Sequence, residues 1–410
     1  MKYIIIALAL LPALMKISSL PFNAYGFGLL SGWLGMSLIA ASLLLIIREP
    51  AWTDWFGGLQ HMYLWHHRMG MMGYVLLLAH PLILSSHYFE LDLDVAWQYL
   101  SPFNPDPINM VGWTGLITFM LGLAATFTQR LSYSLWRRLH MLLVGAIMLG
   151  LGHIWMADSS SVSFVIACFT VALAIGWRII RGDYGIGAFP YEVNAVYHPT
   201  EQITEVSLRS LAKPMLIAPG QFVNAAFFQG PNFQGCGEFH PYTVSRVAKD
   251  GSLSLNIKAL GYCTKHIQSL EPGVAVHLQG PYGNFLLDRP FSPEIWIAAG
   301  IGITPFLALL RSDKVDQKTD LIYLHREKEN VPFEKELQTY AANQELLHFH
   351  SLAMENDPTL LFKWLASISR LKEQQIYLCG PPLLIALTTS WLQEQGVSRR
   401  QIHFEQFDFR

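Results

Sequence analysis

The chain has 410 residues, of which 52% are apolar, with a formal net charge of −2 and a mean hydropathy of +0.29. An ordinary soluble protein carries less apolar sequence, so part of the chain is expected to lie in lipid. The balanced charge offers no basic surface for nucleic acid and argues against that partner. The cysteines are widely spaced without a CxxC pair, which predicts neither a disulfide framework nor a zinc site: Cys168, Cys236, Cys263 and Cys379.

Apolar runs near the length that crosses about 30 Å of hydrocarbon fill the first part of the chain. They cover residues 3–20, 26–47, 62–85, 109–129, 138–157 and 162–180. The first run follows Lys2 as a signal peptide would, but no small-x-small cleavage site is evident and Lys16 interrupts its core. A retained helix is therefore predicted. Residues 1–183 are expected to form a transmembrane bundle of about six helices.

Charge asymmetry predicts the orientation of these helices. The loop at about 86–108 contains no Lys or Arg but has four acidic residues, Glu90, Asp92, Asp94 and Asp106, which places it outside under the positive-inside rule. Arginines gather at the opposite ends of the runs: Arg48, Arg68, Arg130, Arg137, Arg138, Arg178 and Arg181. A multi-pass protein of the cell membrane is expected, with both termini and all later domains in the cytoplasm.

Histidines stand near both ends of the third and fifth runs. They are His66 and His80 in one run and His140 and His153 in the other. A polar ring in hydrocarbon is costly, so such residues are functional candidates. Fourteen helical residues rise about 21 Å and return to nearly the same face, which lets one helix hold two stacked cofactors. Parallel helices would pair His66 with His140 and His80 with His153, and each pair suits one b-type haem iron.

Two details of this pattern leave alternatives open. The 13-residue step from His140 to His153 would turn the second ring by about 140° on an ideal helix. Glycines within that run are expected to permit overwinding or a kink: Gly145, Gly150 and Gly152. His67 is a rival to His66, which the helical wheel favours. For a single histidine, a hydrogen bond to a neighbouring helix would be the simpler reading, and the matched pairs favour haem.

Beyond Arg181 a Gly/Pro linker leads to short alternating runs, which predict an antiparallel β-barrel over residues 184–288. In it, the HPYTVS strand offers an aromatic ring to a flavin and a hydroxyl to the flavin's reactive edge: His240, Pro241, Tyr242, Thr243, Val244 and Ser245. The GYCTK segment then provides helix-start amides with Thr264 and Lys265 for a pyrophosphate. A GPYG turn follows, and the order of these elements predicts an FAD site.

Residues 289–410 alternate buried strands with helices, as in a doubly wound, Rossmann-like α/β domain. The segment AAGIGITP runs from a strand through a Gly-rich turn into a helix. Its amides, around Gly300, Gly302 and Thr304, are suited to a dinucleotide pyrophosphate, although the pattern is not the usual GxGxxG.

The segment LCGPP ends another strand at its carboxyl end, where open α/β sheets bind ligands. Cys379 is therefore expected to face a nicotinamide ring beside Gly380 and Pro381, and a buried structural cysteine is the alternative. Arg326 follows the strand DLIYLH. It is either a ligand of a 2′-phosphate, which would favour NADPH, or ordinary surface charge.

Over nearly the whole chain these motifs resemble bacterial NADPH oxidases and, more broadly, the ferric-reductase and NADPH-oxidase superfamily. The resemblance rests on the His-x(12–13)-His helices, WRRLH, HPYTVS, GPYG, AAGIGITPF, LCGPP and an aromatic residue near the carboxyl end. It implies FAD contacts by Tyr242, Thr243, Ser245, Lys265 and Phe409, with Phe409 stacked on the isoalloxazine. It further implies nucleotide contacts by Gly300, Gly302, Thr304, Cys379, Gly380 and Pro381, and bis-histidine haem ligation. Tyr262 departs from the acidic residue that relatives often carry there.

The expected activity is electron transfer from cytoplasmic NADPH or NADH through FAD and the two haems to an acceptor outside. Cys379 and Thr243 are expected at the reacting rings. With O2 as acceptor the product is superoxide. Two alternatives remain. A ferric-chelate reductase would use the same series of cofactors with a different outer pocket, and an electron-relay subunit would pass electrons to a periplasmic partner protein. No obligatory protein partner is evident from the sequence.

Overall fold

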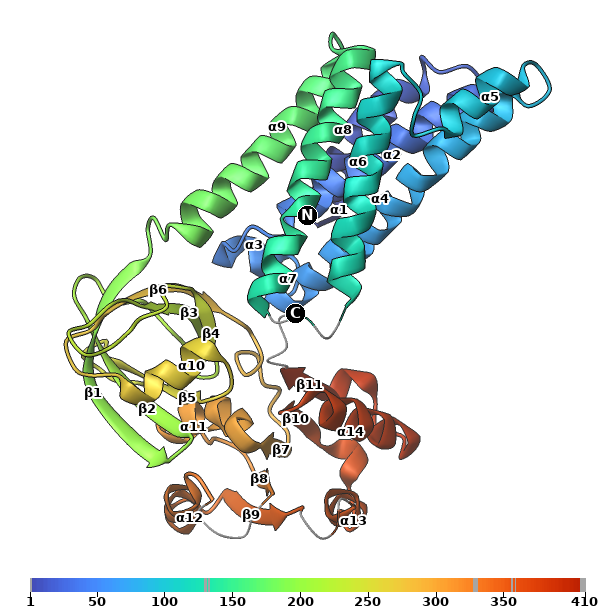
Figure 1. Cartoon of the computed structure of the whole chain (residues 1–410). Helices are drawn as coiled ribbons and strands as arrows, with labels where there is room; N and C mark the ends of the chain where they lie inside the picture. Colours follow the sequence, from blue (N-terminus) through green and yellow to red (C-terminus); the bar gives the residue numbers. More distant parts are fainter. Residues whose placement is uncertain are drawn as a thin grey trace. The chain divides into compact units, whose positions relative to one another are not determined.

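The computed structural model describes residues 2–128, 131, 133–326, 331–354, 357 and 359–405. The chain divides into two compact units, residues 1–182 and 183–410. The first is helical, and the second joins a β-barrel to a sheet with helices (Figure 1). Arg130 and Phe409, which carried sequence predictions, lie outside the described residues.

Long apolar helices make up the first unit. Its elements are α1 (Lys2–Ile17), α2 (Ala24–Leu44), α3 (Pro50–Trp55), α4 (Leu59–Tyr88), α5 (Leu93–Leu100), α6 (Pro107–Phe127), α7 (Tyr133–His140), α8 (Leu142–Asp158), α9 (Val162–Trp177) and a terminal π-helical turn (Arg178–Asp183). Within the described residues, five stretches are long and apolar enough to span a membrane: Ala24–Leu44, Leu59–Tyr88, Pro107–Phe127, Leu135–Asp158 and Val162–Asp183. The predicted first span corresponds to α1, whose 16 residues fall short of the about 20 needed, so a sixth span is not confirmed.

Polar caps define where several of these helices begin. The Asn23 side chain accepts a hydrogen bond from the Gly26 amide at the start of α2 (3.0 Å). The Ser161 hydroxyl accepts one from the Phe164 amide at the start of α9 (3.2 Å). The first amides of a helix lack partners within it, so these side chains satisfy donors that lipid could not.

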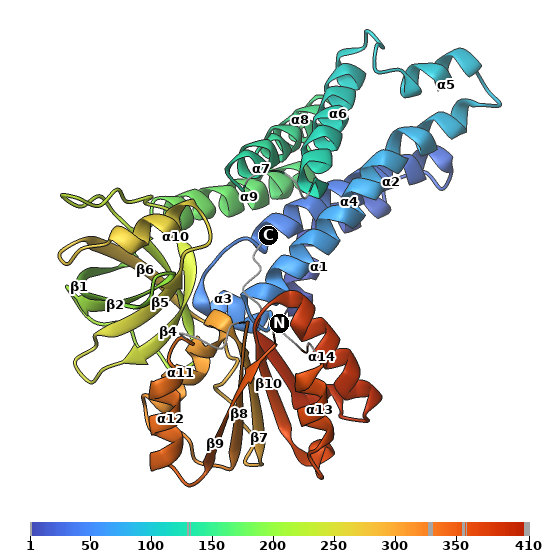
Figure 2. The same cartoon turned by 60° about the horizontal axis from the view of Figure 1, so that its bottom comes forward.

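Small residues let α2 and α4 lie side by side (Figures 1 and 2). A Cβ atom added to Gly73 would stand 2.9 Å from the carbonyl oxygen of Gly35, and one added to Gly35 would stand 3.0 Å from that of Gly73. The two backbones are therefore in direct contact. Such close packing stabilises helix pairs where lipid removes the usual hydrophobic driving force.

The second unit begins with a closed antiparallel barrel in the order β1-β2-β5-β4-β3-β6. Alternate side chains fill its interior, as Val206 and Leu208 do on β2. The short elements α10 (Tyr262–His266) and η2 (Ile267–Ser269) connect two of its strands. The strands are β1 (Phe189–Thr200), β2 (Ile203–Ser210), β3 (Phe222–Phe227), β4 (His240–Val247), β5 (Leu253–Lys258) and β6 (Ala275–Tyr282).

A parallel sheet in the order β11-β10-β7-β8-β9 completes this unit. Its elements are β7 (Glu294–Ala299), η3 (Gly300–Ile303), α11 (Thr304–Leu310), β8 (Thr319–His325), α12 (Glu334–Asn343), β9 (Leu347–Ala353), α13 (Leu360–Ala366), η4 (Leu371–Glu373), β10 (Gln375–Cys379), α14 (Pro382–Glu394), η5 (Arg399–Gln401) and β11 (Ile402–Glu405). Helices α11 and α12 cover one face, and α13 and α14 cover the other (Figure 2). The predicted barrel and the predicted doubly wound sheet are both confirmed.

We predict that Gly35→Ala and Gly73→Ala each destabilise the helical unit by about 1–3 kcal/mol, because the added methyl group forces α2 and α4 apart. Thermal unfolding of the full chain in detergent measures the effect. Gly70→Ala on the same helix is the control, since a Cβ there meets nothing within 4 Å. Equal unfolding temperatures for all three variants would contradict the close backbone contact.

Candidate functional site

One pair of imidazole rings joins α4 to α8. The ring centroids of His80 and His153 are 6.2 Å apart, with an interplanar angle of 80°. His80 Nδ1 lies 2.7 Å from the carbonyl oxygen of Gly28, and His153 Nδ1 lies 2.9 Å from that of Ile108. A carbonyl oxygen can only accept, so Nδ1 carries the proton in each ring. Each Nε2 is left with a lone pair for a ligand.

Two glycines make room for these rings. A Cβ atom added to Gly32 would lie 2.9 Å from His80 Nδ1, and one added to Gly112 would lie 2.9 Å from His153 Nδ1. Each glycine stands four residues after the carbonyl that the same ring uses, Gly28 for one and Ile108 for the other. Both imidazoles thus rest on a neighbouring helix at a place that any larger residue would obstruct.

A second pair lies nearer the start of α4. The centroids of His66 and His140 are 6.5 Å apart at an interplanar angle of 65°. His66 Nδ1 donates to the carbonyl oxygen of Ser42 (2.9 Å). His140 Nδ1 lies 3.0 Å from Thr126 Oγ1, whose own proton goes to the Gly122 carbonyl oxygen (2.9 Å). His140 therefore donates to the hydroxyl, and its Nε2, like that of the other rings, is left with a lone pair.

A break in the helix accounts for the shorter step from His140 to His153. α7 ends at His140 and α8 begins at Leu142, with Met141 between them in a turn. The Val144 amide donates to the Met141 carbonyl three residues back (3.0 Å) rather than four. This tighter turn changes the direction of the following side chains. The irregularity lies at Met141, whereas the sequence placed it at the glycines farther along α8.

In the barrel, the predicted flavin-binding strand is β4. The hydroxyls of Tyr242 and Thr243 are buried and have no hydrogen-bond partner among the described residues. Buried hydroxyls normally have partners, so these two are available to a ligand. Ser245 is engaged within the barrel, donating to the Ser254 carbonyl oxygen (3.1 Å) and accepting from Asn256 Nδ2 (2.7 Å). His240 and Pro241 are half-buried at the start of the strand.

The GYCTK segment forms the start of α10. Thr264 Oγ1 accepts hydrogen bonds from the backbone amides of Leu260 (2.9 Å) and Gly261 (2.8 Å), which fixes the turn. Lys265 is exposed, and so is Tyr262. The ammonium group is therefore open to an anionic ligand, while the threonine hydroxyl already has backbone partners.

The two motifs predicted to bind nucleotide adjoin one another. A Cβ atom on Gly302 would collide with the carbonyl group of Cys379, so only glycine lets η3 approach the end of β10. Gly300 has a φ of +55°, a conformation that favours glycine. The Thr304 hydroxyl donates to the Ile301 carbonyl oxygen (3.0 Å) and braces the turn.

Cys379 is buried at the carboxyl end of β10, followed by Gly380 and then Pro381, which is exposed. Burial raises the pKa of its thiol, and the Glu405 carboxylate adds to the shift. The thiol of Cys379 is thus held in its neutral form. Arg326 is exposed directly after β8, a parallel strand of the same sheet.

Two features of the second unit were not predicted from the sequence. Glu405 pairs with Cys379 in register on β11, and its Oε2 is buried without a hydrogen-bond partner among the described residues. Burial raises the pKa of this carboxyl to about 8. In the sequence Glu405 is one of two acidic residues near the end, and nothing in its position signals burial.

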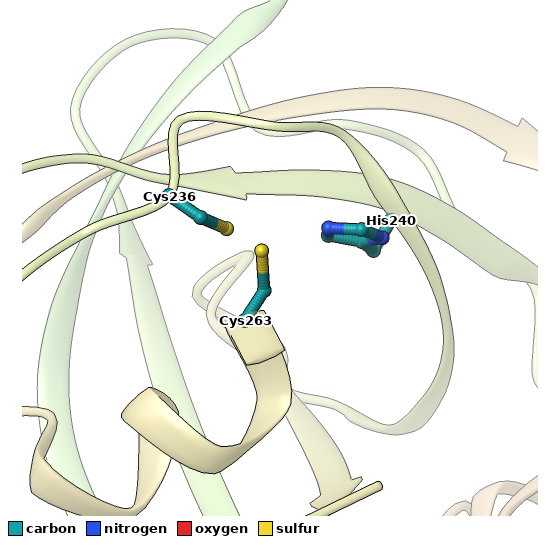
Figure 3. Close-up of side chains that lie close together, drawn as sticks. All are labelled: Cys236, His240 and Cys263. Carbon is teal, nitrogen blue, oxygen red and sulfur yellow. The ribbon is translucent and has the colours of Figure 1, made fainter. Parts of the chain in front are cut away.

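The second feature is a group of side chains of the kinds that bind metal ions. Cys236, His240 and Cys263 offer ligand atoms within 4.8 Å of one another (Figure 3). The cysteine spacing predicted no metal site, because β4 and β5 separate the two thiols along the chain and only barrel closure brings them together.

The chain matches three family models in succession. Residues 31–151 match the ferric reductase like transmembrane component, residues 194–286 the oxidoreductase FAD-binding domain and residues 296–390 the oxidoreductase NAD-binding domain. This combination defines a multi-pass membrane oxidoreductase with flavin- and nucleotide-binding domains. The chain belongs to the ferric reductase-like transmembrane family that carries reductase domains of the ferredoxin-reductase type.

Two named relatives each match about half of the chain. The toluate 1,2-dioxygenase electron transfer component of Pseudomonas putida is 28% identical over 52% of this chain and 66% of its own length. Ferredoxin–NADP reductase B of Sorangium cellulosum is 25% identical over 54% of this chain and 100% of its own. The chain thus spans just under two thirds of the first protein's length.

A solved structure is also similar to the chain. The flavohemoglobin of Malassezia yamatoensis, with bound FAD and heme, matches with a TM-score of 0.50 and 17% identity, over 97% of this chain and 98% of that one. At this level of identity the likeness concerns the fold alone.

Glu405→Gln is expected to stabilise the chain relative to the wild type increasingly as pH rises from about 5 to about 8. The folded pKa of about 8 lies above the ordinary value of 4.5, so the wild type holds the proton more tightly when folded. The stability that this tighter proton binding gives the folded wild type is complete below about pH 4.5 and is lost as pH rises through about 8. Glutamine stays neutral over the whole range.

Unfolding temperatures of the full chain in detergent across this pH range measure the difference. The exposed Glu345→Gln serves as the control. If Glu405→Gln behaved like the control, the carboxyl would not be buried in the folded protein.

Proposed function

We propose that this chain carries electrons from NAD(P)H through FAD and two b-type haems across the membrane, with molecular oxygen as the acceptor and superoxide as the product. In this proposal residues 1–183 hold the haems, 184–288 bind FAD and 289–410 bind the nucleotide. The observation that carries this proposal is the arrangement of four histidines in two facing pairs, one of His66 and His140 and one of His80 and His153. All four Nδ1 atoms have hydrogen-bond partners.

The ring geometry fits iron ligation by two imidazoles. With metal–nitrogen bonds of about 2.0 Å and about 1.1 Å from each nitrogen to its ring centre, two rings on one iron would have centroids about 6 Å apart. The measured separations are 6.5 Å for His66 and His140 and 6.2 Å for His80 and His153. Hydrogen bonds from Nδ1 hold a ligating ring in one tautomer and raise its basicity, as seen around metal-bound histidines generally.

The other cofactors would be held by the second unit. When bound, FAD accepts a hydride from a nicotinamide and releases electrons singly, and haem iron carries them one at a time. The hydroxyls of Tyr242 and Thr243 are available for the flavin, and Lys265 for its pyrophosphate. His240, Pro241, Ser245 and Thr264 would shape this site, with Phe409 stacking on the flavin as the family resemblance implies.

The nucleotide would lie at the carboxyl ends of β7 and β10. Amides of the turn at Gly300 and Gly302 would face its pyrophosphate, with Thr304 bracing that turn. Cys379, Gly380 and Pro381 would border the nicotinamide, and Arg326 is exposed where a 2′-phosphate would favour NADPH over NADH. A buried, neutral Cys379 thiol presents a small apolar surface to the ring.

One surface feature favours a ferric chelate as an alternative acceptor. The segment between α4 and α6 exposes four carboxylates, Glu90, Asp92, Asp94 and Asp106. Oxygen ligands of this kind suit hard cations. The same segment exposes apolar side chains, including Trp97 at 69% and Phe103 at 91%, which favours a protein partner as a further alternative.

The proposal predicts two haems per chain that NADPH reduces without oxygen. The full chain is purified in detergent, supplied with FAD and NADPH anaerobically, and its haem absorption bands are followed. His80→Ala and His153→Ala are each expected to lower the haem content to one and leave that haem reducible. His61→Ala, an exposed histidine at the start of α4, is the control with two haems.

Admission of air then identifies the acceptor. Rapid reoxidation with superoxide dismutase-sensitive reduction of a superoxide probe supports the oxidase. Reduced haem that persists in air until a ferric chelate is added supports the reductase. Haem that stays reduced after both air and a ferric chelate are added supports a relay to a partner protein. A preparation with no b-type haem, or with haem that NADPH cannot reduce, would overturn the transmembrane pathway.

Gly32→Ala and Gly112→Ala are expected to weaken binding of the same haem that His80→Ala and His153→Ala remove, because each methyl group displaces one imidazole ring. Haem content and the reduction midpoint of that haem are measured in each variant. Gly145→Ala on α8 is the matched control, since a Cβ there meets nothing within 4 Å. Unchanged haem in all three variants would show that these glycines do not position the ligands.

A further inference from the structure

Three side chains from separate parts of the barrel unit meet at one point. Cys236 lies in the loop between β3 and β4, His240 begins β4, and Cys263 is in the first turn of α10. Their ligand atoms all lie within 4.8 Å of one another, and all three residues are partly buried. In Figure 3 both sulfur atoms and the edge of the imidazole ring point toward a common centre. We call these residues the Cys–His–Cys cluster.

The loop around Cys236 is held tightly by the glycines on either side. A Cβ atom on Gly235 would collide with the backbone of Phe228. Gly237 has a φ of +61°, and its amide donates to the Phe227 carbonyl oxygen (3.1 Å). The thiol of Cys236 is therefore presented from a backbone that the end of β3 fixes in place.

The imidazole distinguishes a metal site from a pair of thiols. His240 Nε2 is buried and has no hydrogen-bond partner among the described residues. A disulfide between Cys236 and Cys263 would leave this nitrogen unsatisfied, which is costly for a buried polar atom. A metal ion bound by both sulfurs and Nε2 satisfies all three groups together.

The donor set matches a known class of ion site. Two cysteines and one histidine bind Zn²⁺ with bonds of about 2.3 Å to sulfur and about 2.0 Å to nitrogen, so tetrahedral ligands stand about 3.5–3.8 Å apart. The three ligand atoms of the cluster already lie within 4.8 Å of one another, so binding an ion would require them to move only slightly closer. The Glu238 carboxylate also has an oxygen 3.8 Å from His240 Nε2.

Binding of a zinc ion by the two sulfur atoms would release the thiol protons to solvent, without any change of oxidation state.

We propose that the Cys–His–Cys cluster binds one Zn²⁺ ion, which ties the loop before β4 to the start of α10. The site goes beyond the proposed electron transfer, since neither hydride transfer nor haem reduction requires it. It would fasten together the two segments on which the predicted flavin contacts lie, His240 to Ser245 and Thr264 to Lys265.

The test is the metal content of the full chain, expressed with zinc in defined medium and purified in detergent through a tag without histidine. We expect one zinc per chain. Cys236→Ser and Cys263→Ser should each lose it, while Cys168→Ser in α9, outside the cluster, should keep it. Zinc-edge X-ray absorption of the wild type should show two sulfur neighbours at about 2.3 Å and nitrogen or oxygen at about 2.0 Å.

X-ray absorption of the wild type decides the question even if the cysteine variants fail to fold. Three results would overturn the proposal: no zinc with both thiols free to alkylation, zinc retained in the Cys236→Ser/Cys263→Ser double variant, or a disulfide-linked peptide joining the two cysteines. None of these readouts depends on haem, flavin or turnover, so failure here and failure of the proposed electron pathway are distinguishable.

Discussion

The helical unit depends on hydrogen bonds that imidazole rings make inside an apolar bundle. Lipid offers no partner for a polar nitrogen, so each Nδ1 must find an acceptor on a neighbouring helix. His80 and His153 do so in the same way, each reaching a backbone carbonyl whose helix carries a glycine four residues later, Gly32 or Gly112. These bonds orient the Nε2 atoms, and the proposed haem ligation depends on that orientation.

In the second unit, close approach of two backbone segments positions the predicted nucleotide site. The absence of a side chain at Gly302 lets the turn after β7 touch the carbonyl of Cys379 at the end of β10. Two segments far apart in sequence therefore share one edge of the sheet, and β11 adds Glu405 beside them. Ligands of open α/β sheets bind at this kind of edge, at the carboxyl ends of the strands.

The step from His140 to His153 shows how a local irregularity corrects a mismatch in helical period. On α4 the histidines are fourteen residues apart and nearly in phase, but thirteen residues leave the second ring well off the face. The turn at Met141 interrupts the helix directly after His140. His140 is thereby separated from the period of α8 and meets His66, while His153 follows that period and meets His80.

Apolar length, strand alternation and motif order by themselves determined the membrane helices, the barrel, the parallel sheet and the histidine pairing, because each is a periodic or local property of the chain. The tertiary structure decided the rest. Only barrel closure unites Cys236, His240 and Cys263, only strand order buries Glu405 beside Cys379, and α1 proves shorter than its apolar run. Such contacts join residues distant along the chain, and their burial follows from packing that no local pattern encodes.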